Sequence, residues 1–124
     1  MYHIKISTHF SSAHSLRYYR GKCEKLHGHN WKVEVTVEAR ELDDLGMVMD
    51  FKDLKSAVNE VLQELDHAYL NDLPYFREHN PSSEEIARYL YLRVKERVSR
   101  DGRRVHEVRV WETDTACAVY FERK

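Results

Sequence analysis

Three histidines near the start of the chain are the residues best suited to chemistry. His27 and His29 are separated by a single glycine, and His14 lies upstream. Residues two apart in an extended segment point to the same face, so both imidazoles of the pair can reach one ion. Three histidines with one open position are typical of a catalytic zinc site. The spacing leaves the third ligand open, because His3 and His9 are also upstream, and ordinary surface or core histidines are the alternative.

A cysteine lies four residues before His27. Cys23 is flanked by Lys22 and Lys25, and a nearby cation or metal ion favours the thiolate. If Cys23 were a fourth ligand beside three histidines, the site would be closed and structural. Outside the coordination sphere, its thiolate could remove a proton from a bound substrate. The residues alone leave both roles open.

Two acidic positions could complete such a site. Asp66 and His67 are adjacent, and a neighbouring acid and imidazole can form a proton relay. The alternative is a histidine that stabilises the C-terminus of a helix. Glu112 has the parity of Val108 and Val110, so its carboxylate points to the apolar face of a strand and needs a partner. That partner is either a ligand with several N–H donors or a buried Arg or Lys.

Alternating residues predict the strands that position these groups. Residues 2–10 alternate between apolar and polar side chains, and residues 31–39 do so more clearly, which is typical of a strand with one dry and one wet face. Val108 and Val110 mark a third strand. In a fourth strand Cys117 alternates with apolar neighbours, so it is predicted to lie in the core.

Two helices are expected between these strand pairs. Asp50 is a helix N-cap residue before an apolar stripe in residues 51–65. Ser82 opens a second helix, with Glu85 three residues on as a capping box, and residues 66–81 are expected to form a loop. The order ββααββ predicts an α+β domain over residues 1–124, with a four-stranded antiparallel sheet and two helices on one face. Self-association into a larger barrel would cover the sheet's edges and second face.

Composition narrows the class of protein. With 124 residues, 42% apolar and 33% charged, the chain is expected to be globular. A net charge of -1 gives no reason to expect nucleic acid or an anionic membrane as a partner. The sequence has no apolar stretch long enough for a signal peptide or a membrane span, so we expect a cytoplasmic protein with reduced cysteines.

Taken together, the motifs resemble the 6-pyruvoyl-tetrahydropterin synthase family. They span nearly the whole chain in a specific order: Phe10-Ser11-Ser12-Ala13-His14, Cys23-x-x-x-His27-Gly28-His29-Asn30, Leu65-Asp66-His67-Ala68-Tyr69-Leu70-Asn71, Asn80-Pro81-Ser82-Ser83-Glu84 and Trp111-Glu112-Thr113. The resemblance implies the tunnelling fold, in which trimers form a twelve-stranded barrel and two trimers stack into a homohexamer. It also implies catalytic groups that meet across a subunit interface.

The resemblance also implies roles for individual residues. The zinc ligands are the trio His14, His27 and His29. The proton acceptor is Cys23, and Asp66 with His67 forms a relay. Glu112 anchors the pterin ring, helped by Thr113 and by the backbone of Ser82 and Ser83.

The cysteine motif distinguishes branches of the family. Three residues between Cys23 and His27 resemble the 6-carboxy-5,6,7,8-tetrahydropterin synthases of queuosine (7-deazaguanine) biosynthesis, whereas the tetrahydrobiopterin branch has a longer gap. Glu24 resembles a folate-pathway branch that cleaves dihydroneopterin to 6-hydroxymethyl-dihydropterin. Both residues together resemble a subgroup that serves both pathways; alternatively, Glu24 is a solvated loop residue.

The expected function is therefore that of a zinc-dependent carbon–carbon lyase. Its substrate would be 7,8-dihydroneopterin triphosphate, and its products 6-carboxy-tetrahydropterin, acetaldehyde and triphosphate. Dihydroneopterin cleavage for folate is the alternative within enzymes. A non-catalytic zinc- or pterin-binding protein is the alternative of another class.

Overall fold

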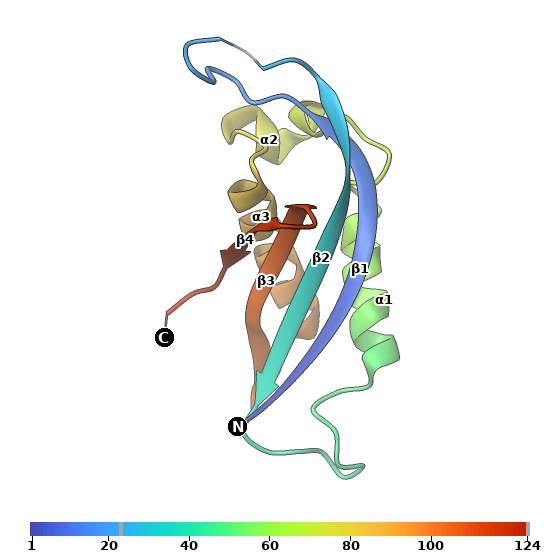
Figure 1. Ribbon diagram of the computed structural model, residues 1–124. Coiled ribbons are helices and arrows are strands. Elements are labelled where there is room, and N and C mark those ends of the chain that lie inside the picture. Colours follow the sequence, from blue (N-terminus) through green and yellow to red (C-terminus); the bar gives the residue numbers. More distant parts are fainter. Residues whose placement is uncertain (23, 124) are drawn as a thin grey trace.

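The computed structural model describes residues 1–22 and 24–123 and shows a four-stranded antiparallel sheet (Figure 1). Along the sheet the strands follow their order in the sequence. They are β1 Tyr2–His14, β2 His27–Ala39, β3 Arg103–Thr113 and β4 Ala116–Tyr120. The first two form a long hairpin that extends beyond β3 at the end carrying the connection 15–26 (Figure 1).

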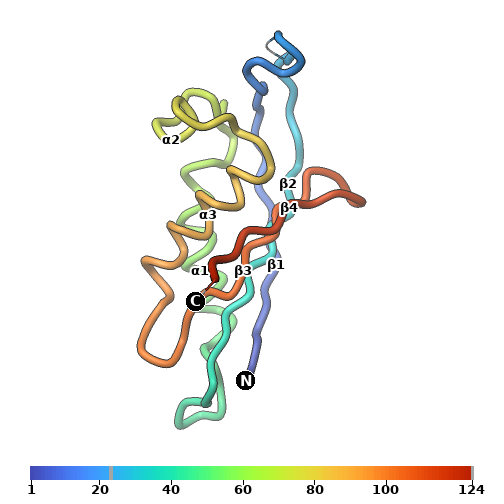
Figure 2. The backbone as a smooth tube through the Cα atoms, turned by 90° about the vertical axis from the view of Figure 1, so that its left-hand side faces the viewer, coloured from blue at the N-terminus to red at the C-terminus, as the bar shows by residue number. Residues whose placement is uncertain are grey.

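Two long helices cover one face of this sheet and leave the other face bare (Figure 2). They are α1 Phe51–Leu62 and α3 Ser83–Val98. The predicted α+β arrangement is confirmed. The expected loop over residues 66–81 is wrong in part, because it contains the 3-10 helix η1 Leu70–Asp72 and the short helix α2 Pro74–Glu78. Neither segment is long enough to show the helical periodicity on which the prediction relied.

The apolar face of β2 forms the centre of the core. Its alternate residues are fully buried against the helices, while the residues between them point to the bare face. The fully buried aliphatic residues include Val33, Val35 and Val37 of β2, Leu54, Val58 and Val61 of α1, Ile86, Leu90, Val94 and Val98 of α3, and Val108 and Val110 of β3. Burial of these side chains is what holds the helical layer on the sheet.

Both predicted helix N-caps are present. The Asp50 carboxylate accepts a hydrogen bond from the Lys52 N–H at 2.8 Å, and the Ser82 hydroxyl accepts one from the Glu85 N–H at 3.2 Å. These bonds satisfy backbone donors that have no partner within the helix. The first helix ends at Leu62 rather than at the predicted residue 65, although Leu65 is buried as its position in the stripe required.

The first hairpin is longer than the predicted strands. The first strand continues to His14 instead of ending at residue 10, and the second begins at His27 instead of residue 31. Cross-strand pairing explains the difference, since the pairs continue without interruption up to His14 opposite His27. Alternation of side chains could not reveal this extension, because Ser, Gly and Asn are neither strongly apolar nor strong strand formers.

The predicted core position of Cys117 is wrong. This thiol is exposed, and Cys117 pairs with Trp111 on the bare face of the sheet. Ala118 and Tyr120 occupy the helix-facing positions instead, and the Tyr120 ring lies 5.0 Å from the Tyr91 ring of α3. The prediction assigned the wrong parity because the short strand carries apolar residues on both faces.

None of the helices within residues 1–22 and 24–123 is long and apolar enough to cross a membrane.

The Asp50 cap gives the first testable prediction. Replacing Asp50 with Ala removes the side-chain acceptor of the Lys52 N–H, and should lower the free energy of unfolding by about 1 kcal/mol. Urea unfolding followed by circular dichroism measures the change. Asp44→Ala, an exposed turn residue, is the matched control. Equal stability of the two variants would contradict the cap's contribution.

Candidate metal centre

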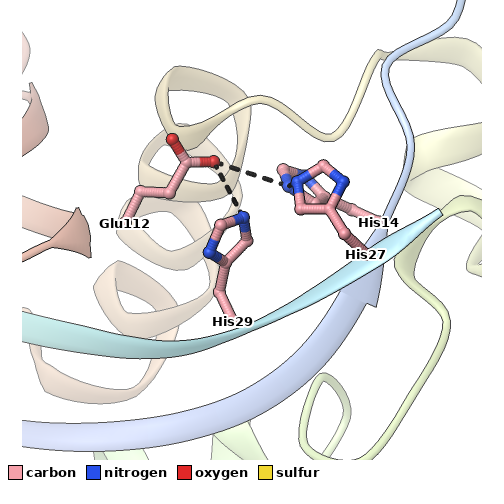
Figure 3. Close-up of side chains that lie close together, drawn as sticks. All are labelled: His14, His27, His29 and Glu112. Carbon is pink, nitrogen blue, oxygen red and sulfur yellow. Dashed lines mark hydrogen bonds and ion pairs between the residues drawn. The ribbon is translucent and has the colours of Figure 1, made fainter. Parts of the chain in front are cut away.

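Strand register brings three histidines together at the end of the first hairpin. His14 and His27 are direct cross-strand partners, and His29 is opposite Ser12. Because these positions share the helix-facing side of the sheet, the three imidazoles converge (Figure 3). Their ring centroids lie 4.5 to 5.1 Å apart. The predicted trio is therefore assembled by the hairpin itself.

The other upstream histidines are placed elsewhere. His9 is opposite Lys32 and so has the opposite parity to His14, on the bare face of the sheet. His3 lies near the start of the same strand, where it contacts Glu38. The structure thus selects His14 as the third member of the group for a reason that spacing could not supply, namely the face of the strand.

Backbone carbonyls fix the orientation of two imidazoles. His14 Nδ1 is 2.7 Å from the carbonyl oxygen of Pro81, and His27 Nδ1 is 2.9 Å from that of Lys25. A carbonyl can only accept, so each Nδ1 carries a proton, and in the neutral ring each Nε2 then has the lone pair. These Nε2 atoms face one another at 3.0 Å. Metal-binding histidines are oriented in this way by their outer hydrogen bonds.

The third imidazole, His29, has a buried nitrogen that is available to bind a ligand. Its Nε2 is buried and has no hydrogen-bond partner among the described residues. Burial, with the neighbouring imidazoles His14 and His27, lowers the pKa of His29 below its ordinary value, although the Glu112 carboxylate opposes the shift. A lowered pKa keeps the ring neutral at physiological pH, and the neutral ring is the form that binds a metal ion.

Glu112 reaches the same point from the third strand (Figure 3). One carboxylate oxygen lies 3.4 Å from His14 Nε2 and 3.4 Å from His29 Nε2. Its predicted helix-facing parity is confirmed by these contacts. Among the described residues, the carboxylate meets these imidazoles and not the buried Arg or Lys that was one expected partner. Its contact with a ligand stays a prediction.

The donor set fits a divalent transition ion. Three imidazole nitrogens and one carboxylate oxygen lie within 4.8 Å of one another. In a tetrahedral site with bonds of about 2.0–2.1 Å, neighbouring donors are about 3.3 Å apart, close to the separations of 3.0 and 3.4 Å found here. The Trp31 ring, fully buried, lies 5.0 Å from both His14 and His29 and gives the group an apolar floor.

Other predicted site residues surround this group. The Glu24 carboxylate lies 3.8 Å from His27 Nδ1 and also accepts from the Leu16 N–H at 3.3 Å, so it contacts the centre and helps to hold the loop. Ser82 caps α3 and follows Pro81, the residue whose carbonyl orients His14. The first helical turn, with Ser83, therefore begins beside the histidines.

Two further predicted residues contact one another away from this group. The Asp66 carboxylate accepts from the Ser11 N–H at 2.8 Å and lies 3.0 Å from His67 Nδ1. The hydrogen bond from Ser11 is the main cause that lowers the pKa of Asp66, and His67 adds to the shift. His67 has a backbone φ of 54° and a side chain that is 83% exposed, so its imidazole points away from the core.

Cys23 and Thr113 are the remaining predicted residues. Cys23 lies outside the described residues, so its predicted role stays a prediction. Thr113 is exposed at the end of β3, where its hydroxyl is 3.5 Å from that of Thr115. In the connection 15–26, the guanidinium of Arg17 donates to the carbonyls of Phe76 and His79, which ties that connection to α2.

Sequence reasoning missed the carbonyls of Lys25 and Pro81. Backbone groups carry no residue-type signal, so only coordinates reveal them. The contact of Glu112 with the histidines was also missed, although its parity was an available signal.

The fold and this centre define a small α+β protein with a histidine-based candidate metal site. The family model for 6-pyruvoyl tetrahydropterin synthase matches residues 3–123, and the chain belongs to that family. A relative from Archaeoglobus fulgidus is 44% identical over 111 residues, covering 90% of this chain and 88% of its own length. A Synechocystis protein named 6-carboxy-5,6,7,8-tetrahydropterin synthase is 38% identical over 117 residues, covering 90% and 87%.

A solved structure shows the same fold. The 6-pyruvoyl tetrahydropterin synthase of Caenorhabditis elegans superimposes with a TM-score of 0.85 at 24% identity, covering 98% of this chain and 96% of that chain. The predicted family and fold are confirmed by these similarities.

Replacing His29 with Gln tests the centre. The amide keeps a similar volume but removes the imidazole, so the chain should lose about one bound divalent ion. Elemental analysis of the purified protein by mass spectrometry measures the number of divalent ions bound per chain. His9→Gln, on the other face of the same hairpin, is the control and should keep the wild-type content. Unchanged ion content in His29→Gln would show that this group does not hold the ion.

Proposed function

We propose that this chain is a 6-carboxy-5,6,7,8-tetrahydropterin synthase of queuosine biosynthesis. It would convert 7,8-dihydroneopterin triphosphate and water to 6-carboxy-tetrahydropterin, acetaldehyde and triphosphate. The observation that carries this proposal is the pair of imidazoles, His14 and His27, whose Nδ1 atoms meet backbone carbonyls while their Nε2 atoms converge. The Synechocystis relative's name supports the choice of branch.

The cofactor of this proposal is a zinc ion held by His14, His27 and His29. Imidazole nitrogens are ligands that zinc prefers. The apolar Trp31 ring beside His14 limits the access of water to the ion. When bound, zinc supplies Lewis-acid polarisation that acidifies the C–H bonds beside the substrate's side-chain hydroxyls.

Within this proposal, Cys23 is the base that takes the substrate proton. In the sequence it lies four residues before His27, one of the proposed zinc ligands. A thiolate near a cation is a better base at neutral pH than an isolated thiol is. This role needs a reduced thiol, which is the normal state in the cytoplasm, where we place the enzyme.

Asp66 and His67 form the proton relay of the proposal. The 3.0 Å contact between Asp66 and His67 Nδ1 favours a proton on that nitrogen, which leaves Nε2 to exchange protons with the substrate. The low pKa of Asp66 keeps its carboxylate charged and able to stabilise the imidazolium.

Glu112 is proposed to anchor the pterin ring. A carboxylate can accept two N–H donors at once, which matches the ring N–H and amino group of a pterin. Its side chain is 36% exposed, so it can turn from His14 toward a ligand. Thr113 and the backbone of Ser82 and Ser83 would complete this recognition, supported by the start of α3 beside the centre.

The active unit is proposed to be a homohexamer, a dimer of trimers with sites between subunits. The outer strands β1 and β4 each pair with one named strand in the sheet, which leaves backbone groups for pairing with another copy. His67 points outward, as expected of a group that serves a neighbouring subunit's site. Closing the sheets into a barrel would also cover their bare faces.

Dihydroneopterin cleavage for the folate pathway is the second candidate function. The observation that favours it is the Glu24 carboxylate, 3.8 Å from His27 Nδ1 and therefore beside the centre. A carboxyl group there could act as an acid or a base on a substrate without a triphosphate.

Cys23→Ala tests the proposed base. Turnover of 7,8-dihydroneopterin triphosphate should fall by about 10²–10⁴-fold, the usual contribution of a general acid or base, while zinc stays bound. Chromatography of the products and elemental analysis measure the two quantities. Cys117→Ala removes the exposed thiol and is the matched control, expected to be fully active. Loss of zinc in Cys23→Ala would identify the cysteine as a ligand and contradict its role as base.

Glu24→Gln separates the two candidate pathways. The amide keeps an acceptor for the Leu16 N–H but cannot transfer a proton at neutral pH. With the triphosphate substrate, formation of the 6-carboxy product should be unchanged. Any 6-hydroxymethyl product from dihydroneopterin should be lost. A wild-type enzyme that acts only on dihydroneopterin would refute the queuosine assignment, and an absence of product from both pterins would favour a non-catalytic binding protein.

A further inference from the structure

Three side chains from three strands form a second cluster at the opposite end of the sheet. His3 of β1, Glu38 of β2 and His106 of β3 each offer one donor atom, and these atoms lie within 4.8 Å of one another. They sit on the bare face, whereas the first centre lies on the helix-covered face. From this geometry we infer that His3, Glu38 and His106 form a second site for a divalent transition ion.

A β-bulge places His106 in this cluster. Val105 pairs with Val37, and Glu107 pairs with Thr36, so His106 is an extra residue without a Cα partner on β2. Bulges re-aim a side chain relative to a regular strand. Here the bulge places the His106 imidazole beside Glu38. The centroids of the His106 and His3 rings are 4.4 Å apart.

Donor separations fit ion coordination better than direct ion pairing. His3 Nε2 and His106 Nδ1 are each 3.3 Å from the same Glu38 oxygen, Oε2. Charge-assisted N–H···O bonds are shorter, about 2.7–2.9 Å. Neighbouring ligands of a tetrahedral ion with bonds of about 2.0–2.1 Å are about 3.3 Å apart. Both separations from Glu38 therefore match those expected between neighbouring ligands of one ion.

The Glu38 carboxylate is held ready for this role. It is buried, and its other oxygen, Oε1, accepts from Arg104 Nε at 2.6 Å, which turns Oε2 toward the imidazoles. The guanidinium of Arg104 also places one positive charge beside this buried carboxylate. A carboxylate that is charged and buried gains from a bound cation.

A second carboxylate, that of Glu107, lies near the His106 nitrogen that faces away from Glu38. His106 Nε2 is 3.7 Å from Glu107, whose carboxylate is also bonded to Arg109 at 2.5 Å. The distance from His106 Nε2 to Glu107 is too long for a hydrogen bond, but the negative charge of Glu107 favours a proton on Nε2 and so the tautomer with a lone pair on Nδ1. The His106 Nδ1 lone pair would then face Oε2 of Glu38.

Access and donor type indicate which ions fit. His3 and His106 are half exposed, and a cavity of about 750 Å³ at this end of the sheet is lined in part by Glu38 and Arg104. An ion can therefore enter from solvent. Two imidazoles and one carboxylate with open positions suit first-row ions such as Fe²⁺, Co²⁺, Ni²⁺ and Zn²⁺. Bound there, the ion would join β1, β2 and β3 at the end away from the first centre.

Cobalt titration tests the second site. Metal-free full-length chain, without a histidine tag, is titrated with Co²⁺, and bound ions are counted by equilibrium dialysis. The wild-type chain should bind about two ions, and His3→Gln and His106→Gln about one each. His9→Gln is the matched control, because it lies on the same face of β1 as His3, and should bind as many ions as the wild type.

The outcomes separate this site from the proposed active centre. His29→Gln should also bind about one ion, and that ion should disappear when His106→Gln is added. If the wild type binds a single ion that depends on His106 and not on His29, the second site stands and the first fails. The inference is overturned if both His3→Gln and His106→Gln, shown to be folded by circular dichroism, bind as many ions as the wild type.

Discussion

The cross-strand pairing of His14 with His27 is the constraint on which the site depends. It places two imidazoles side by side at the end of a hairpin, and the two-residue period of β2 adds His29 on the same face. Carbonyl acceptors then fix both paired rings with Nε2 directed inward. A one-residue slip of the register would turn a whole strand's side chains to the other face and separate the group.

The two faces of the sheet carry different chemistry for a physical reason. The helix-covered face is apolar along most of β2, and the three histidines lie at the end of the hairpin that extends beyond β3 (Figure 1). There the buried Nε2 of His29 has no hydrogen-bond partner among the described residues, and a bound ion would satisfy it. The bare face is crossed by ion pairs, including those of Glu38 and Glu107. Asp66 and His67 lie beside Ser11 of the edge strand β1.

Much of this arrangement could be predicted from the sequence, and the failures have identifiable causes. Alternation in residues 31–39 predicted a strand because burial on one face requires that period, and Ser82 with Glu85 predicted a helix start because capping is local. The extension of the hairpin to His14 was missed because it depends on the partner strand. Cys117 was misplaced because a strand of five residues with small apolar side chains gives little contrast between its faces. The carbonyl partners of the imidazoles could not be predicted at all, since any residue supplies a carbonyl.

The central claim is that three imidazoles hold one ion while the Cys23 sulfur stays outside the coordination shell. X-ray absorption at the zinc edge tests it most directly, using the His106→Gln chain loaded with one zinc ion so that only the first centre is observed. The account predicts a shell of nitrogen and oxygen donors at about 2.0–2.1 Å, with the pattern of about three imidazoles. A sulfur donor at about 2.3 Å would contradict it, because a coordinated thiolate cannot serve as the free base.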